Sequence, residues 1–436
     1  MKIMRRRLHR SWRLLFLPAL LAGPNALAAQ DAVRVVSLEE AVRLAAARDP
    51  AVVAAEAAVD GARAGRLQAR GAWLPSVSVN SVYGNSSNQR FDQSTGQLVS
   101  ENYNAGIDGG LVLFAGGRRL TALRAAEAEL DAADANEVAR RFEAGQAAKV
   151  AYHAATAASD LLRVSEQRLE RAGQQLGFAR TRYEVGTATT SDLLRAEIEL
   201  ANAELGEYEA RSQLRSAGLV LGRAIGVPEE VQAAEADLPE TAPALQPVAV
   251  LVARAVRGSP AVLAAEAAAA SSRAQRLAAY TPYLPTVQVN GGYDWFAFEF
   301  PPDQRSWSFR VVASLPVFNN FQREAALIRA GAQERTAEAR ALDASLAARV
   351  AVEEGVRAIE LAERRVEVSA RTVALAAEDL RVQEERYQIG ATTILELQAS
   401  QVALAESEVA GVRARQDLAT AVARLETILG ETIGDE

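Results

Sequence analysis

The residue types that usually perform catalysis or bind soft metals are nearly absent from this sequence. It contains no cysteine, and both methionines, Met1 and Met4, lie at the N-terminus together with His9. Only His153 remains in the body of the chain. The sequence also lacks a glycine-rich phosphate loop and paired acids in a plausible pocket. We therefore predict no enzyme activity, no cofactor and no metal site.

The N-terminus has the pattern of a secretory signal peptide. A basic cluster precedes the apolar run 14–22, and Ala26-Leu27-Ala28 forms a small-x-small cleavage site. The apolar run is shorter than the roughly 20 residues of a membrane-spanning helix and is interrupted by Pro18. We expect a signal peptide over residues 1–28 and a secreted chain that begins near Ala29.

The charge balance of the secreted chain is acidic. The first 28 residues hold six of the 48 basic residues and none of the 55 acidic ones, so the remainder carries a net charge of −13. An acidic chain disfavours a nucleic-acid partner. Because there is no cysteine to carry a lipid, any membrane attachment must come from the fold itself.

The secreted chain contains two copies of one plan. PAVVAAE at 50–56 recurs as PAVLAAE at 260–266, and RYEVG at 182–186 recurs as RYQIG at 386–390. Repeats of this kind indicate duplicated structural units. Each half reads as helix, strand, loop, strand, very long helix, tight turn and long helix. The predicted segments are a first repeat at 29–227, a proline-rich linker at 228–247, a second repeat at 248–430 and a short C-terminal tail at 431–436.

Four segments alternate strictly between apolar and polar residues. In the first of them Val77, Val79 and Tyr83 face one way, and Ser78 and Asn80 face the other. A soluble sheet with one wet face would give the same pattern on one strand, but aromatic-rich segments of about ten residues also typify a transmembrane barrel with a wet lumen. The predicted strands span about 75–88, 101–114, 285–299 and 305–318.

Four such strands cannot close a membrane barrel by themselves. A spanning sheet tolerates no free edge, and the smallest barrels need about eight strands. Three copies of the chain would supply twelve strands. We therefore predict a homotrimer whose shared barrel contacts outer-membrane lipid.

Two very long helices are expected beside the strands. From about Gly117 to Val185, and again from about Asn320 to Ile389, there is no proline. Helices of roughly 70 residues would be on the order of 100 Å long, a length typical of coiled coils. A glycine ends each helix, and Thr or Ser residues that can cap a returning helix follow it. We expect tip turns near 186–191 and 390–395, at the far end from the strands.

The predicted fold class is therefore mainly α with a transmembrane β-barrel. A tandem repeat of helix-strand-strand-helix would form, in a homotrimer, one 12-stranded barrel and a long α-helical coiled-coil tunnel. The helices alone would also suit an ordinary extended bundle. The tandem repeat, together with the four barrel-type strands, favours the tunnel over the extended bundle.

The whole secreted chain resembles the TolC-type outer-membrane efflux factors. The resemblance rests on the doubled plan, on LFAGGRR at 113–119, and on the two RYxxG motifs that begin at Arg182 and Arg386. It implies a passive efflux or type I secretion channel in the outer membrane of a Gram-negative bacterium, extending into the periplasm. It also implies two partners, a periplasmic adaptor (membrane fusion) protein and an inner-membrane pump of the RND, ABC or MFS type.

The resemblance also implies roles for residues at the tips. The residues expected at the gate or constriction are Tyr387, Asp192, Ser191 and Glu396. Tyr387 would reach Asp192 in the neighbouring tip. Glu396 would line the constriction, where three such carboxylates in a ring would select cations. The alternative for Asp192 and Glu396 is that each only caps a helix N-terminus. The tip residues expected to contact the adaptor are Gly186, Thr187, Gly390, Ala391 and Thr392.

Two positions at the second tip depart from the family pattern. Thr392 stands where the best-known member carries a gate-holding arginine, and Ala399 replaces a second acid of the ring. The gate would then be held by fewer links.

A second hypothesis is that the chain is a periplasmic adaptor or coiled-coil interaction protein of such a system. An adaptor would normally have one helical hairpin inserted into a small β-domain, whereas this sequence predicts two hairpins and four amphipathic strands. The transported substrate is not specified by the sequence. The lack of Met and Cys in the secreted chain disfavours a channel dedicated to copper or silver.

Overall fold

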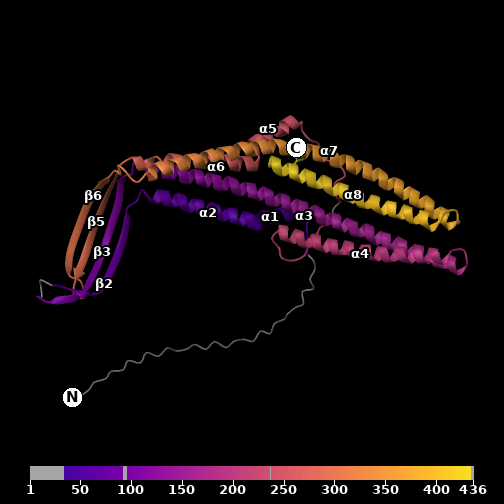
Figure 1. The fold of residues 1–436 in the computed structure, drawn as a ribbon, viewed down its shortest axis with the longest axis horizontal. Coiled ribbons are helices and arrows are strands. Elements are labelled where there is room, and N and C mark those ends of the chain that lie inside the picture. The colour runs from indigo at the N-terminus through magenta and orange to yellow at the C-terminus, as the bar shows by residue number, and fades with distance from the viewer. Residues whose placement is uncertain (1–33, 92–95, 236, 434–436) are drawn as a thin grey trace, which may run out of the picture.

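The molecule is elongated, with a β-sheet at one end and two helical tips at the other (Figure 1). The computed structural model describes residues 34–91, 96–235 and 237–433. The predicted signal peptide, residues 1–28, and the last three residues of the predicted tail lie outside the described residues. The sheet and the tips are joined by helices that run along the long axis (Figure 1).

The order of the elements confirms the tandem repeat. In each half, short helices lead into two strands, a very long helix and a shorter returning helix. The helices are α1 (Leu38–Arg48), α2 (Pro50–Gly71), α3 (Arg118–Glu184), α4 (Thr190–Ala224), α5 (Val248–Gly258), α6 (Pro260–Ala278), α7 (Gln322–Gln388) and α8 (Ile394–Leu429), with the 3-10 turn η1 (Thr281–Tyr283). The strands are β1 (Arg34–Val36), β2 (Ser76–Phe91), β3 (Leu98–Phe114), β4 (Val231–Ala233), β5 (Thr286–Ala297) and β6 (Gln304–Ser314).

The four long strands form one antiparallel sheet in the order β2-β3-β5-β6. β2 and β6 are its two edges, so each has one side without a strand partner in the described ranges. Polar residues share one face. Gly106 is paired with Asn80 on one side and with Asp294 on the other. An added Cβ at Gly106 would come within 2.5 Å of an Asp294 carboxylate oxygen, so glycine makes room for the polar side chains.

The strand limits differ from those predicted at two places. β6 ends at Ser314 rather than near 318, because Pro316 has no N–H to continue the ladder. β2 and β3 extend further than predicted, and Arg90 pairs with Val99 beyond a register shift. A short strand, β4, also lies inside the predicted linker and pairs in parallel with β1.

Similar bends join the sheet to the long helices in the two halves. Gly116 and Gly117 have positive φ angles of 55° and 76°, and Asn320 and Phe321, at the equivalent positions, have 55° and 61°. Glycine adopts this conformation without strain, whereas Phe321 does so only because the surrounding structure imposes it. An arginine follows two residues after each bend. Arg119 donates to the Val112 carbonyl within β3, and Arg323 donates to the Pro316 and Val317 carbonyls just after β6.

The long helices pack through a largely alanine seam in the first hairpin and through larger aliphatic residues in the second. α3 and α7 contain 67 residues each, which corresponds to about 100 Å. α3 pairs with α4, α7 pairs with α8, and α3 also contacts α8, which brings the two hairpins side by side. Ala148 and Ala155 of α3 are buried beside Leu221 of α4, and Leu418 of α8 is buried in a second core. Small side chains at such seams let the helices approach closely.

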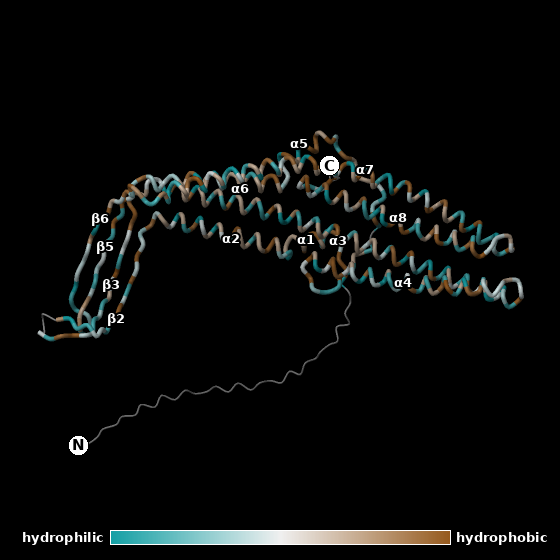
Figure 2. The backbone as a smooth tube through the Cα atoms, viewed as in Figure 1, coloured by the Kyte–Doolittle hydropathy of each residue, from teal (hydrophilic) through white to brown (hydrophobic). Residues whose placement is uncertain are grey.

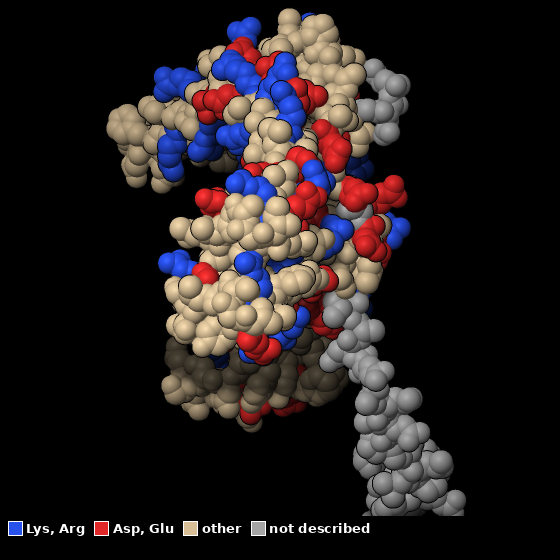
Figure 3. All heavy atoms as spheres, turned by 90° about the vertical axis from the view of Figure 1, so that its right-hand side faces the viewer, with Lys and Arg blue, Asp and Glu red and all other residues tan. Residues whose placement is uncertain are grey.

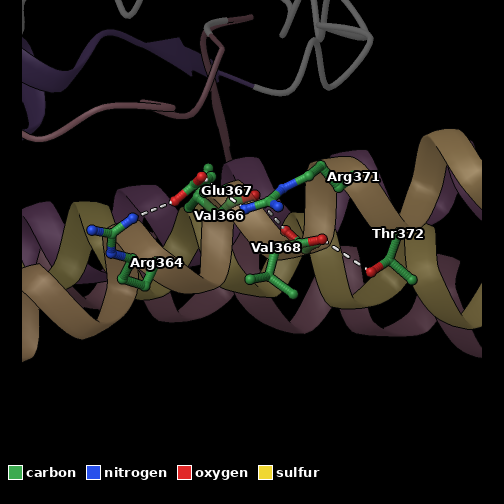
Figure 4. Close-up of polar contacts among 7 residues, drawn as sticks. Arg364, Val366, Glu367, Val368, Arg371 and Thr372 are labelled. Carbon is green, nitrogen blue, oxygen red and sulfur yellow. Dashed lines mark hydrogen bonds and ion pairs between the residues drawn. The ribbon is translucent and has the colours of Figure 1, made fainter.

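The outer face of α7 carries ion pairs instead of a core. Glu367 accepts hydrogen bonds from Arg364 at 2.7 Å and Arg371 at 2.8 Å (Figure 4). These two guanidinium groups hold the pKa of Glu367 below its ordinary value. Such exposed pairs add little stability individually.

One helical stretch in the described residues, Val248–Tyr283, is long and apolar enough to cross a membrane by length and composition alone. It comprises α5 and α6, which meet at Ser259. Both helices pack against α7, and α6 also packs against α3. The stretch therefore belongs to the helical body of the protomer.

Candidate functional site: the two helical tips

The two tips have nearly the same backbone. Gly186 and Gly390 have φ angles of 79° and 78°, a left-handed conformation that favours glycine at a helix end. The residue after each glycine donates its backbone N–H to the arginine carbonyl of the RYxxG motif, at 2.8 Å in both tips. The repeated motif therefore encodes one tight turn between antiparallel helices, used twice.

The adaptor-contact residues predicted from the resemblance lie on these turns. Gly186, Thr187, Gly390 and Ala391 are exposed, and Thr392 is half-buried. Basic and acidic side chains are mixed over the surface when the molecule is viewed from its tip end (Figure 3). The turns are thus accessible to a second protein, and contact with an adaptor stays a prediction.

Arg182 of the first tip lies against Tyr387 of the second. Its Nη1 atom donates a hydrogen bond of 2.8 Å to the backbone carbonyl of Tyr387. Its guanidinium carbon lies 4.9 Å from the centre of the Tyr387 ring. The carbonyl is near the C-terminus of α7, where unpaired carbonyls and the helix dipole favour a cation. Arg182 therefore ties one hairpin to the other by a charged hydrogen bond and a cation–π contact.

Tyr387 is part of a small core between the tips. Its side chain is 8% exposed and belongs to a cluster with Ala179, Ala196 and Leu397, which come from three other helices. Burial raises the pKa of the Tyr387 phenol above its ordinary value, while the Arg182 guanidinium acts in the opposite direction. The phenol is therefore neutral at physiological pH.

Asp192 is bound within its own helix. Its backbone N–H donates to the Thr189 side chain at 3.2 Å, and its carboxylate accepts the Thr189 backbone N–H at 2.9 Å. These reciprocal bonds form a capping box at the start of α4. No hydrogen bond joins Tyr387 to Asp192 within the described residues, although the Asp192 charge contributes to the raised pKa of Tyr387. Ser191 is exposed in the first turn of α4.

Glu396 is exposed in the first turn of α8. Its backbone N–H donates to the side chain of Thr393 at 3.3 Å, and its carboxylate accepts a hydrogen bond from Thr392. Thr392, the position that departs from the family pattern, thus holds the carboxylate predicted to line the constriction. The local contacts of Asp192 are those of a helix cap. Glu396 also has cap contacts, but its carboxylate is exposed and other groups can approach it.

The role of Arg182 was not predicted from the sequence. Arg182 is the first residue of the repeated RYxxG motif, and this repetition was the only sequence feature that pointed to it. Its contact could not be derived from the motif, because Arg386 has the same position in the second copy and bonds instead to Ala391 of its own turn at 3.4 Å.

Comparison with known proteins agrees with this architecture. A family model described as outer membrane efflux protein matches residues 41–227 and 251–431. The chain is 28% identical to Protein CyaE of Bordetella pertussis over 324 residues, which cover 73% of this chain and 68% of that protein.

Solved structures have the same fold. The outer membrane protein VceC of Vibrio cholerae is 19% identical, with a TM-score of 0.74 and coverage of 91% of this chain and 96% of that one. The open state of the MtrE outer membrane channel of Neisseria gonorrhoeae is 20% identical, with a TM-score of 0.74 and coverage of 92% and 90%.

The matched ranges include both repeats, both pairs of long helices and all four long strands. The chain belongs to the outer membrane efflux protein family. It is a channel protein of efflux or secretion in the Gram-negative outer membrane, and it extends into the periplasm. The family is one of transport proteins rather than enzymes.

Proposed function

We propose that three copies of this chain form one passive duct across the outer membrane and the periplasm. The observation that carries the proposal is that the sheet and the helices leave their free edges on the same two sides of the protomer. The sheet ends in β2 on one side and β6 on the other. An unpaired edge is not stable in a membrane, so β6 of one copy would pair with β2 of the next.

The helical layer supports the same assembly. Near the sheet the contacts run in the order α2, α3, α6, α7, and near the tips in the order α4, α3, α8, α7. α7 is therefore one edge along its whole length, and α2 and α4 form the other. β6 leads directly into α7, and α2 leads directly into β2, so strand edges and helix edges coincide.

The helix edges near the tips carry unpartnered apolar stripes. On α7, Leu361, Val368 and Leu375 recur at heptad spacing and are exposed, and Leu375 is 73% exposed. On α4, Ile198 and Leu205 are exposed seven residues apart. Apolar residues are distributed along both hairpins in Figure 2. A heptad stripe on each edge suits coiled-coil packing of α7 against α4 of a second copy.

The assembly would form a ring because its interface is head-to-tail. One copy would use its β6 and α7 edge and the next its β2, α2 and α4 edge, and such interfaces close into rings. Three copies give twelve strands, a number compatible with a membrane barrel. Native mass spectrometry of protein released from detergent tests this stoichiometry. We expect three chains per particle; a monomer that needs no detergent would contradict the duct and favour the adaptor hypothesis.

In the duct, cargo would be delivered by an inner-membrane pump and a periplasmic adaptor at the tips. The narrowest point would lie at the tips, where Tyr387, Asp192 and Glu396 are close to the turns. Glu396 supports this role because its exposed carboxylate would be repeated three times around the axis. A ring of like charges attracts cations and disfavours full closure.

A further inference from the structure

The two RYxxG arginines are equivalent in sequence but differ in their contacts. Arg182 reaches the neighbouring hairpin, with a 2.8 Å hydrogen bond to the Tyr387 carbonyl and its guanidinium over the Tyr387 ring. Within the described residues, the side chain of Arg386 donates a single, long hydrogen bond of 3.4 Å to the Ala391 carbonyl in its own turn. Because the two tips have the same backbone, the difference comes from what lies beside each of them.

Arg182 covers one face of the second tip. The equivalent face of the first tip is uncovered. An added Cβ at Gly390 would meet Nη2 of Arg182 at 3.7 Å, whereas an added Cβ at Gly186 would meet no atom within 4 Å. Tyr183 is 42% exposed, compared with 8% for its counterpart Tyr387. The first tip therefore presents the same tyrosine and carbonyl as the second, and no arginine in the described part of the chain covers them.

The internal repeat shows which group would cover it. Near the tips the helices lie in the order α4, α3, α8, α7. The repeat equates α3 with α7 and α4 with α8, so one step around the proposed ring carries the first hairpin onto the second. The next step carries the second hairpin onto the first hairpin of the next copy. Under these steps Arg182 corresponds to Arg386, and Tyr387 corresponds to Tyr183 of the next copy. The contact between Arg182 and Tyr387 within one chain therefore has a counterpart between Arg386 and Tyr183 of the next copy.

We propose that Arg386 of one protomer binds the Tyr183 ring and backbone carbonyl of the next protomer, as Arg182 binds Tyr387 within the chain. The inference rests on the proposed trimer. It adds a ring of arginine–tyrosine contacts at the tips that alternate within and between protomers. Each guanidinium stacks on an aromatic ring and caps a helix C-terminus, where its positive charge is favoured. The opening at the tips of the trimer could widen only if these contacts between protomers break or shift.

Cross-linking tests the proposed contact, and the natural absence of cysteine makes the experiment clean. The test variant carries Arg386→Cys and Tyr183→Cys. A short bis-maleimide is used, because an arginine side chain spans more than the Cα separation that a disulfide allows. We expect covalent dimers and trimers on a denaturing gel. The matched pair Arg182→Cys and Tyr387→Cys should link within one chain and migrate as a monomer.

Two controls set the background. Arg386→Cys alone, and Arg386→Cys with Val35→Cys on the distant strand β1, should give no covalent oligomer. The particle mass is measured before cross-linking. A trimeric variant that gives only monomer bands would overturn the contact and leave the trimer intact. A monomeric unmodified chain would instead overturn the proposed function.

If the double-cysteine variant does not assemble, a second measurement tests the same contact. A photo-reactive benzoylphenylalanine at position 386 replaces only the arginine, and its adducts are mapped by mass spectrometry. An adduct with Tyr183 or its immediate neighbours on a second chain supports the contact. Adducts confined to the same chain, or to another region of the second chain, contradict it.

Discussion

At the scale of single residues, the carboxylate of Asp192 has two roles that can be separated. It forms the capping box with Thr189, and its charge acts on the neighbouring Tyr387 phenol. Thr189→Ala removes the hydroxyl that accepts the Asp192 backbone N–H, a cap worth about 1 kcal/mol, and keeps the carboxylate. Asp192→Ala removes the carboxylate and keeps that backbone cap. The pair of variants therefore distinguishes a helix cap from a gate residue.

We predict that Asp192→Ala combined with Tyr387→Phe raises single-channel conductance or open time. Loosening the tip by about 1 kcal/mol would change the ratio of open to closed states roughly fivefold. Tyr387→Phe alone should have the smaller effect, because it keeps the ring and the carbonyl that Arg182 contacts. Thr189→Ala is the control. Conductance that stays unchanged in the double variant would remove both residues from the gate.

The side-chain contacts at the tips were the least predictable feature of the protein. The turns follow from Gly186 and Gly390, which a left-handed helix end requires. The acids at 192 and 396 follow from motif position. The contact of Arg182 does not, because two identical motifs lie in different surroundings, and only the packing of hairpins decides which arginine meets a neighbour in the same chain.

At the scale of elements, α3 and α8 meet at a pair of ionisable groups beside His153. Lys149 Nζ lies 2.6 Å from Glu426 Oε2, and both side chains are largely buried. His153 lies one helical turn from Lys149 and is half-buried. Burial lowers the pKa of His153, the Lys149 charge lowers it further, and the Glu426 charge opposes both.

We predict that this histidine makes folding less favourable in mild acid. The unfolded chain takes up the proton near the ordinary pKa of 6.5, and the folded chain takes it up only at lower pH. Stability is therefore complete above about pH 6.5 and falls as the pH decreases, by at most about 1.4 kcal/mol per pH unit for one proton. Thermal unfolding at pH 7.5 and 5.5 should show a smaller pH effect in His153→Gln. Identical pH effects in both proteins would contradict this assignment.

A second element-scale prediction concerns a buried amide in α3. Gln175 is 4% exposed, and neither its side-chain oxygen nor its side-chain nitrogen has a hydrogen-bond partner among the described residues. An unpaired buried polar group costs about 1–3 kcal/mol. Gln175→Leu should therefore raise the thermal unfolding midpoint, while Gln174→Leu at the exposed neighbouring position should not. A lower midpoint for Gln175→Leu would show that the amide has a partner in the assembled protein.

The elements themselves were largely predictable. Apolar alternation located the four strands, and the absence of proline located both long helices to within a few residues. The end of β6 was misplaced because the apolar pattern continues through Leu315 and Val317, whereas hydrogen bonding stops before Pro316. The β1–β4 pair was missed, because three-residue strands have no periodicity to detect.

At the scale of the whole molecule, the proposed trimer makes the edge of α7 an interface. Of the three residues in the apolar stripe on α7, Leu361, Val368 and Leu375, the last is the most exposed. We predict that Leu375→Glu prevents assembly, because it would bury an unpaired carboxylate, while the helical content of the chain is unchanged. Ala374→Glu adds the same charge about 100° around the helix and should still assemble. Equal oligomer mass in both variants would place the interface elsewhere.

The most direct test of the central claim is the current through the purified protein in a planar lipid bilayer. We predict discrete, passive single-channel currents from particles whose native mass corresponds to three chains, with cations favoured over anions because of the Glu396 carboxylates. Glu396→Gln should reduce that preference without abolishing conduction. A bilayer that stays silent with verified trimer, also after the tips are loosened by Asp192→Ala and Tyr387→Phe, would contradict the duct.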